Sequence, residues 1–359
     1  MEPAGFLSSN FSAQVLTIRG AVCMVSYKYQ ILLTEDAHMN HLEQLQKDFI
    51  DLRFGTFIHF NSATVQFHDH ETIDWEFDCE NGPQPRQYPF SPAAWNPDRL
   101  DCRQWAAIAK SAGCRFAALT AKHHEGFALW PTTWSEHCVR NAGRTTDVVA
   151  EYLSAFREAG IAAGLYFSIL DLTAGIGRRS CTPQQKELIK GEITELLTNY
   201  GEIPFLITDG WSAPWGGPGY DVLPFEELDS LVKRLQPNCL LMNIGCSSGL
   251  HGTDVPFFEN AAGQDAEEAF AGPGVACNKL TRTWFWRDED ARTPPASLQW
   301  VQEKLAEYFP MNCAFMLNLS PDVHGQVEQN LAEAFAEIGQ SLQLPAPLKD
   351  IPQGWLRRS

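Results

Sequence analysis

Apolar runs that look like buried strands alternate with helical patterns along most of this 359-residue chain. Most of these runs are apolar on both faces, which is typical of strands in a parallel sheet that is covered on both sides. Eight strands are expected, at 54–60, 114–120, 163–169, 204–209, 239–245, 255–260, 281–286 and 313–319. Helices are expected at 41–52, 102–112, 147–159, 183–200, 225–235, 295–309 and 327–342. Eight strands separated by helices predict an α/β fold of the (β/α)8 barrel type.

The expected barrel is irregular between its fifth and seventh strands. Only nine residues separate Gly245 from Val255, which is too few for a helical crossover between parallel strands. The Gly- and Ala-rich segment 261–280 has room for one or two helical turns. The alternative is an open doubly wound sheet, but no GxGxxG motif follows the first strand. The sequence therefore favours an irregular barrel.

Three segments are expected in the domain organisation. Residues 41–345 should form the barrel, which would be the catalytic domain. Residues 1–40 are an N-terminal extension of unclear role, and residues 346–359 are a C-terminal tail.

Charge and hydropathy argue against two classes of protein. The chain has 27 Lys and Arg against 44 Asp and Glu, a formal net charge of −17. Its longest basic clusters are the pairs Arg178-Arg179 and Arg357-Arg358. Nucleic-acid binding needs a basic face, so no nucleic-acid partner is expected. No apolar run reaches the roughly 18 residues of a spanning helix, so no membrane partner is expected either.

The 10 Cys residues form no CxxC pair and show no zinc-ligand spacing. Cys114, Cys239 and Cys313 begin apolar runs, and buried free thiols in a reducing compartment are the simplest interpretation. The apolar stretch 20–26 is short and no clear small-residue cleavage site follows it. These features predict a cytoplasmic protein.

Polar side chains follow nearly every expected strand. In barrels the reactive residues gather where the strands end, so these side chains should share one pocket. They include His59, Asn61, His123, His124, Glu125, Tyr166, Asp171, Asp209, Asn243, Glu259, Trp284, Trp286 and Asn318.

Two chemistries fit a pocket of carboxylates, imidazoles, amides and indoles. Metal-assisted hydrolysis often needs paired histidines on the first strand, which has only His59. Adjacent His123 and His124 would point to opposite sides of a regular strand unless a bulge intervenes. Glycoside hydrolysis needs two carboxylates, and Asp209 and Glu259 end the fourth and sixth strands. Glycoside hydrolysis is favoured, no metal or cofactor is expected, and a chelator would separate the two hypotheses.

Four segments carry a resemblance to a known family. They read Phe-Gly-Thr-Phe-Ile-His-Phe at 54–60, Leu-Thr-Ala-Lys-His-His-Glu-Gly-Phe at 119–127, Leu-Ile-Thr-Asp-Gly at 206–210, and Asn-Cys-Ala-Phe-Met-Leu-Asn-Leu-Ser-Pro at 312–321. Together they resemble the α-L-fucosidases of glycoside hydrolase family 29, over about residues 41–340. Members of that family often carry a β-sandwich after the barrel. The chain resembles the single-domain kind, with no appended β-sandwich expected.

The resemblance implies the reacting groups. Asp209 matches the family nucleophile, and Tyr166 matches an aromatic residue near it. The acid/base position varies most within the family. Glu259 is the first choice for it, Glu289 the second and Asp254 the third.

The resemblance also implies the substrate-binding groups. His59, His123 and His124 match imidazoles that hold the hydroxyls of fucose. Trp75 and Glu76 lie in the long loop after the first strand and match a segment that closes on the sugar.

Other positions near these motifs have less specific roles. Trp286 is expected in the pocket wall, with substrate contact as its possible role, and Glu125 is expected to form a salt bridge with Lys122 rather than to act in catalysis. Two departures from the family pattern are visible. Phe60 stands where many members have Trp, and Ile244 follows Asn243 where an Arg is common.

These inferences predict a retaining, exo-acting α-L-fucosidase. It would remove terminal α-L-fucose from oligosaccharides or glycoconjugates through a covalent fucosyl-enzyme. Two alternatives stay open, namely a catalytically inactive fucose-binding barrel and a metal-dependent barrel hydrolase. The linkage preference should depend on the loops 61–98 and 261–280, and the sequence carries no signal for the oligomeric state.

Overall fold

The computed structural model describes residues 41–69, 90–177, 181–213 and 217–358. The chain divides into two compact units, of which the smaller comprises Met1–Gln44 and Arg357–Ser359. Within the described part of that unit, residues 41–44 are helical and Arg357 pairs with Glu43 at 3.1 Å. The larger unit, Leu45–Leu356, contains the sheet and every site described below.

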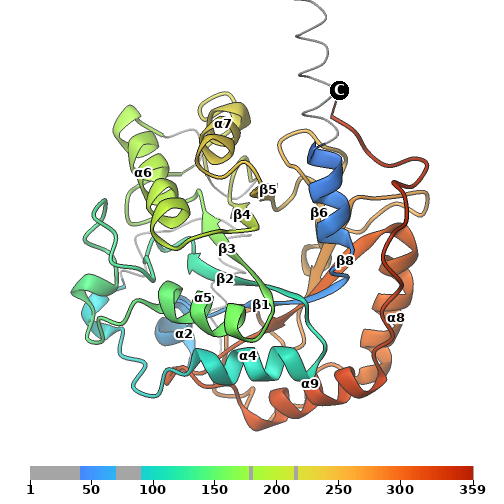
Figure 1. The fold of residues 1–359 in the computed structure, drawn as a ribbon. Helices are drawn as coiled ribbons and strands as arrows, with labels where there is room; N and C mark the ends of the chain where they lie inside the picture. Colours follow the sequence, from blue (N-terminus) through green and yellow to red (C-terminus); the bar gives the residue numbers. More distant parts are fainter. Residues whose placement is uncertain (1–40, 70–89, 178–180, 214–216, 359) are drawn as a thin grey trace, which may run out of the picture. The chain divides into compact units, whose positions relative to one another are not determined.

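Eight strands form one sheet in which every pair of neighbours is parallel (Figure 1). Their order is β5-β4-β3-β2-β1-β8-β7-β6, so the sheet curls into a nearly closed barrel. The strands are β1 (Phe54–Ile58), β2 (Phe116–Lys122), β3 (Ala162–Ser168), β4 (Phe205–Asp209), β5 (Leu240–Asn243), β6 (Phe257–Glu259), β7 (Gly274–Asn278) and β8 (Cys313–Leu319). The predicted (β/α)8 barrel is confirmed.

The barrel is incomplete between β5 and β6, where the sequence predicted an irregularity. These two strands are the ends of the sheet and do not pair with each other. Single backbone hydrogen bonds link the two segments instead, from Asp254 N to Leu241 O at 2.8 Å and from Phe257 N to Cys246 O at 3.0 Å. The short β5–β6 connection leaves no room for a helix that could bring the strands into register.

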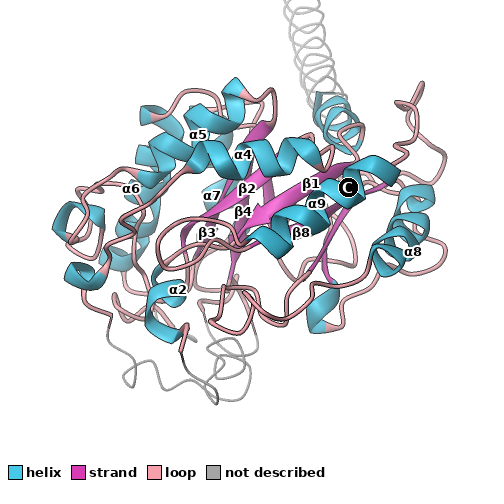
Figure 2. Cartoon of the chain, turned by 90° about the horizontal axis from the view of Figure 1, so that it is seen from below, coloured by secondary structure: helices cyan, strands magenta, loops and turns pink. Residues whose placement is uncertain are grey.

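Helices cover the outside of the sheet (Figure 2). They are α2 (Ser62–Phe67), α4 (Cys102–Ser111), α5 (Val148–Glu158), α6 (Pro183–Asn199), α7 (Phe225–Leu235), α8 (Leu298–Tyr308) and α9 (Gln329–Ser341). Short 3-10 helices occur at η2 (Pro92–Ala94), η3 (Val139–Asn141), η4 (Asn260–Ala262) and η5 (Phe309–Met311). Residues 45–50 are also helical. Helix α2 lies in a stretch without helical periodicity and was not predicted.

Capping residues set where the best-predicted helices begin. The side chain of Thr182 accepts a hydrogen bond from Gln185 N, and the Gln185 side chain accepts one from Thr182 N, which forms a capping box for α6. The Asp147 carboxylate accepts from Ala150 N at the start of α5. Because these caps are local in sequence, the starts of both helices were predictable.

The predicted strand at 281–286 is wrong. The seventh strand is β7, which pairs with β8 from Gly274 to Asn278, and residues 281–285 form bends after it. The run Thr-Arg-Thr-Trp-Phe-Trp has strong β propensity, but this propensity measures how well side chains fit a half-buried surface. Here Trp284 and Phe285 pack against His59 instead, as described below.

Aromatic rings fill the end of the barrel at which the strands begin. The rings of Phe116 and Phe205, at the starts of β2 and β4, lie 6.0 Å apart. Phe49 contacts both, at 5.0 and 5.3 Å. Gly55 makes room for them, because a Cβ there would lie only 2.7 Å from the Phe116 ring. This packing leaves the other end of the barrel for polar side chains.

Two further observations concern the described residues alone. No helix among them combines the length and apolar character that crossing a membrane requires. The eight cysteines in that part of the chain are free thiols, and six of them are buried, among them Cys114, Cys239 and Cys313, which begin apolar runs.

Candidate active site

Asp209 is the last residue of β4, and two donors hold its carboxylate. The Tyr166 hydroxyl donates to Oδ2 at 2.6 Å, and Gly210 N donates to Oδ1 at 2.5 Å. Burial, together with the charge of Asp209, raises the pKa of Tyr166 well above its ordinary value, so the phenol keeps its proton and acts as a donor. The carboxylate is thus fixed in orientation, while its side chain is still 13% exposed.

His123 and His124 lie side by side at the end of β2. The register between β2 and β3 shifts between Thr120 and Lys122, and the two rings after this irregularity lie with centroids only 4.2 Å apart. His124 Nε2 lies 3.6 Å from Asp209 Oδ2, and the His123 ring stacks near that of Tyr166, at 5.9 Å. The structure therefore places His124 beside the predicted nucleophile and His123 next to His124 and Tyr166. The sequence analysis allowed for such a bulge but could not predict it.

His59 follows β1 and is held between aromatic rings. It stacks on Trp284 at 4.7 Å and meets the edge of Phe285 at 5.5 Å. Burial lowers the pKa of His59 well below its ordinary value, and the nearby His123 and Lys279 lower it further. At neutral pH the His59 ring is therefore uncharged.

In all three imidazoles the Nδ1 atom is engaged with a neighbour. His59 Nδ1 faces the carbonyl of Phe57 at 3.3 Å, and His123 Nδ1 lies 2.8 Å from a carboxylate oxygen of Glu125. His124 Nδ1 lies 2.6 Å from the hydroxyl of Ser168. Each partner can accept a hydrogen bond, so in its neutral form each ring carries its proton on Nδ1 and leaves Nε2 as an acceptor.

Glu259 ends β6 and is paired in register with Cys277 of β7. Burial raises the pKa of the Cys277 thiol well above its ordinary value, and the charges of Glu259 and Asp209 both raise it further. The same two carboxylates also raise the pKa of Tyr166. Asp209 and Glu259 therefore both lie close enough to the Tyr166 phenol and the Cys277 thiol to act on them.

Comparisons with known proteins agree with this pocket. A family model described as α-L-fucosidase matches residues 26–346. The chain belongs to the α-L-fucosidase family. It is 32% identical over 285 residues to α-L-fucosidase 1 of Arabidopsis thaliana, covering 70% of this chain and 54% of the plant protein. The chain thus spans about half the length of that relative.

Two further comparisons extend the match. The chain is 33% identical over 332 residues to the tissue α-L-fucosidase of Homo sapiens, covering 82% of this chain and 67% of the human protein. In fold it is similar to a family 29 α-L-fucosidase of Bacteroides thetaiotaomicron, crystallised as a trapped covalent intermediate in complex with 2-fluoro-fucosyl fluoride. That match has a TM-score of 0.68 at 20% identity and covers 82% of this chain and 73% of the other.

The two other acid/base candidates lie in different surroundings. The carboxylate of Glu289 is exposed and forms an ion pair with Arg282 at 3.1 Å. Asp254 is fully buried, and its Oδ2 accepts hydrogen bonds from Lys233 Nζ and Leu241 N, both at 2.6 Å. These bonds tie Asp254 to β5 and α7, away from the strand ends of this fucosidase-family barrel. Glu259 therefore stays the first choice.

The expected salt bridge between Lys122 and Glu125 is wrong. Lys122 Nζ instead binds Glu192 at 2.6 Å and Asp171 at 3.0 Å, and all three side chains are buried. Burial alone would lower the pKa of Lys122, but the two carboxylates raise it above its ordinary value. Glu125 is left to bind His123. The lysine thus connects the loop of the two imidazoles to the loop after β3 and to α6.

We expect Lys122→Met to destabilise the protein by about 3–5 kcal/mol, because it leaves two buried carboxylates without their cation. The free energy of unfolding in urea measures the effect. Lys190→Met on α6 is the matched control, since Lys190 is partly exposed and its ion pairs should contribute less than about 1 kcal/mol. Equal stabilities of the two variants would contradict the assigned role of Lys122.

The remaining predicted substrate-binding residues have mixed outcomes. Trp286 is buried near the ring of His68, at 6.2 Å, and its Nε1 has no hydrogen-bond partner in the described part of the chain. Trp75 and Glu76 lie outside the described residues. Trp284, expected among the strand-end side chains, stacks on His59. The structure adds Phe285, which packs on His59 and His123. Its only sequence signal was the aromatic run that suggested a strand.

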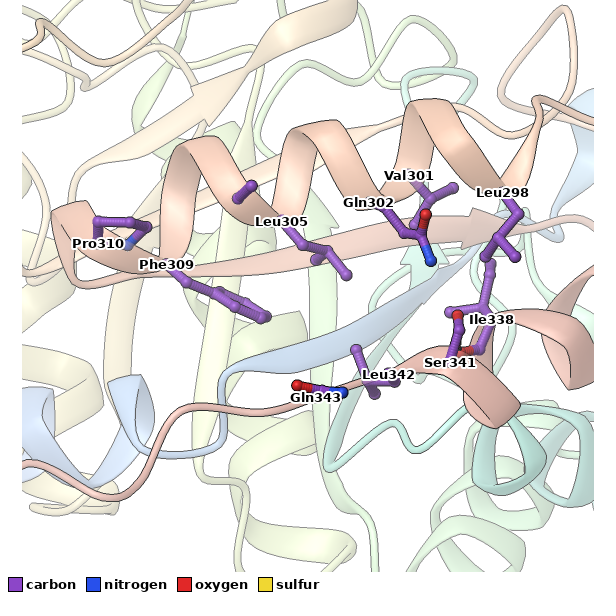
Figure 3. A pocket seen from close by; sticks show the side chains of 11 residues that line it. Leu298, Val301, Gln302, Leu305, Phe309, Pro310, Ile338, Ser341, Leu342 and Gln343 are labelled. Carbon is purple, nitrogen blue, oxygen red and sulfur yellow. Dashed lines mark hydrogen bonds between the residues drawn. The ribbon is translucent and has the colours of Figure 1, made fainter.

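A groove of about 550 Å³ between α8 and α9 is a different kind of surface (Figure 3). Leu305, Phe309, Ile338 and Leu342 supply much of its lining, and none of its lining residues is acidic, basic or a histidine. It therefore has no group that could cleave a glycosidic bond.

Among the described residues, no three His, Cys, Asp or Glu side chains are grouped to hold a metal ion.

Proposed function

We propose that this chain is a retaining, exo-acting α-L-fucosidase whose substrates are fucosylated oligosaccharides or glycoconjugates. The observation that carries the proposal is the Asp209 carboxylate, which Tyr166 and Gly210 hold in place 3.6 Å from the imidazole of His124. The family membership of the chain and the covalent intermediate of the Bacteroides relative support the same proposal.

In the first step, a carboxylate oxygen of Asp209 attacks the anomeric carbon of the bound fucose. The bond from that carbon to the glycosidic oxygen breaks, and Glu259 gives its proton to the departing oxygen. The products are an alcohol and a fucosyl ester of Asp209. The Tyr166 hydroxyl and Gly210 N donate to the carboxylate, which aims it at the sugar before the reaction starts.

In the second step, the Glu259 carboxylate takes a proton from water, and the resulting oxygen attacks the anomeric carbon. The ester bond to Asp209 breaks, and the carboxylate is regenerated. Two displacements at one carbon give fucose with the configuration of the substrate. Glu259 ends the cycle with its proton restored.

The three imidazoles supply acceptors for the sugar hydroxyls. Each has Nδ1 engaged, so Nε2 can accept a hydrogen bond from a hydroxyl group. Burial lowers the pKa of His124 to about 4, so this ring is neutral at the pH of most cells. The flat faces of Trp284 and Phe285 next to His59 offer an apolar surface for the methyl group of fucose.

We expect the purified chain to hydrolyse an aryl α-L-fucoside and to reject the α-D-mannoside with the same leaving group. A site built to bind hydroxyls rejects a substrate that leaves its polar groups unpaired by about 10⁴-fold in kcat/KM. The release of the aryl alcohol measures both rates, with the α-D-glucoside as a second comparison. Equal rates on fucoside and mannoside, or fucose binding without turnover, would contradict the proposed function.

A further inference from the structure

The two adjacent imidazoles are held by acceptors of different charge. His123 Nδ1 is bound to the Glu125 carboxylate at 2.8 Å. His124 Nδ1 is bound to the Ser168 hydroxyl at 2.6 Å, and that hydroxyl donates its own proton to Leu170 O at 2.6 Å. Ser168 can therefore accept from His124 but carries no charge that would favour an imidazolium.

Two rings with centroids 4.2 Å apart do not readily carry two positive charges. When the pair binds one proton beyond its neutral state, that proton must settle on one ring. Glu125 favours His123, and Asp209, whose Oδ2 lies 3.6 Å from His124 Nε2, favours His124. The added proton therefore settles on the ring whose carboxylate attracts it more strongly.

Glu125 has the stronger effect on three grounds. Its oxygen is nearer to its imidazole, at 2.8 Å against 3.6 Å. The charge of Asp209 is already shared with the Tyr166 hydroxyl and Gly210 N. The second oxygen of Glu125, Oε1, is buried and has no hydrogen-bond partner within the described residues. A buried carboxylate in that state depends on His123 for its stabilisation.

We propose that Glu125 is a positioning residue that, as the pH falls, directs the first additional proton of the imidazole pair to His123 and away from the nucleophile. The proposal rests on the proposed function of this pocket. A proton on His124 would instead point from Nε2 at Asp209, bind its carboxylate and weaken its attack on the sugar. With the proton on His123, His124 remains a neutral acceptor and Asp209 keeps its charge.

The other charged and titratable groups around the pair do not reverse this choice. Tyr166 lies on β3 and stays protonated, because burial raises its pKa. His59, after β1, stays neutral because burial lowers its pKa, and Lys279 after β7 adds to that effect. Burial also lowers the pKa of His137, which lies near Glu125. Glu259 acts on Tyr166 and Cys277, and its charge raises the pKa of both groups.

The first experiment follows the imidazole nitrogens of the wild-type chain by ¹⁵N NMR as the pH is lowered. His123→Gln and His124→Gln variants assign the signals. We expect His123 to take up its proton before His124, because the Glu125 carboxylate lies at hydrogen-bond distance from His123 Nδ1. This measurement needs no substrate, so it decides the role of Glu125 even if the chain hydrolyses no fucoside.

The second experiment compares Glu125→Gln and Glu125→Asp in the NMR titration and in the pH profile of kcat. Without the charge, the first proton should go to His124 beside Asp209. In the pH profile of kcat, the acidic limb of Glu125→Gln should then lie about one pH unit above that of the wild type. Glu125→Asp should restore the wild-type order and profile. Glu195→Gln is the matched control, because its carboxylate binds Trp130 and Thr133 rather than an imidazole.

Two results would overturn the proposal. One is a wild-type titration in which His124 takes up its proton before His123. The other is a folded Glu125→Gln variant with the wild-type order and an unmoved acidic side. A uniform loss of kcat at every pH would likewise indicate a merely structural role. If Glu125→Gln does not fold, the wild-type and Glu125→Asp titrations alone decide.

Discussion

Replacing Asp209 by alanine should lower the turnover of an activated aryl α-L-fucoside by about 10⁴-fold or more, because no other group can form the covalent intermediate. Asp209→Asn should lose as much activity, although it keeps the shape of the side chain and an acceptor for Tyr166. Steady-state kinetics with the 4-nitrophenyl substrate measures both variants.

The controls for Asp209 separate chemistry from folding. Asp288→Asn changes an exposed carboxylate that pairs with His68, and it should keep nearly full activity. Thermal unfolding should show that Asp209→Ala is folded. Added azide should partly restore turnover of this variant and give a fucosyl azide of inverted configuration, since the azide then makes the only displacement. Retention of more than about a tenth of the activity would remove Asp209 from the nucleophile role.

Azide should also rescue Glu259→Ala, but the product should have the opposite configuration. Substrates with poor leaving groups should lose about 10²–10⁴-fold in kcat/KM, because no acid protonates the departing oxygen. With an activated leaving group the first step survives, and the fucosyl-enzyme accumulates because no base activates water. Azide needs no base, so it should restore turnover and give a fucosyl azide of retained configuration.

Glu289→Ala is the matched control for the acid/base. Its carboxylate is exposed and paired with Arg282, so its loss should change activity only slightly and azide should have no effect. Product configuration is measured by NMR on the isolated fucosyl azide. Rescue at Glu289 and not at Glu259 would show that the acid/base assignment is wrong, and the fucosidase proposal would stand.

The sequence predicted those parts of the fold whose signals are local. The helices that begin at Thr182 and after Asp147 carry their capping residues next to them. The last strand, Cys313–Leu319, is an apolar run interrupted only by Asn318, and it has the expected limits. The seventh strand was misplaced because Gly274–Asn278 has only 5 residues, and its Gly and Asn have low strand propensity. The aromatic run that follows has the stronger strand signal, yet it packs against imidazoles at the pocket.

The site was predictable in its residues but not in its contacts. His123, His124 and Asp209 follow from the strand ends and the family motifs. The partner of His124, Ser168, is 44 residues away along the chain, and Glu192 is 70 residues from the lysine it binds. Spacing alone paired Lys122 with its neighbour Glu125. Only the packing of β2, β3 and α6 shows that Lys122 is already neutralised and that Glu125 serves an imidazole.

The central claim is a covalent fucosyl ester on Asp209, and trapping it is the most direct test. The wild-type chain should be incubated with 2-fluoro-fucosyl fluoride, which forms the ester quickly and releases it slowly, and then measured intact by mass spectrometry. We expect a mass increase of one fluorofucosyl group, located by peptide mapping on Asp209 and absent in Asp209→Ala. A label on another carboxylate, or no label in a chain that hydrolyses fucosides, would contradict the account.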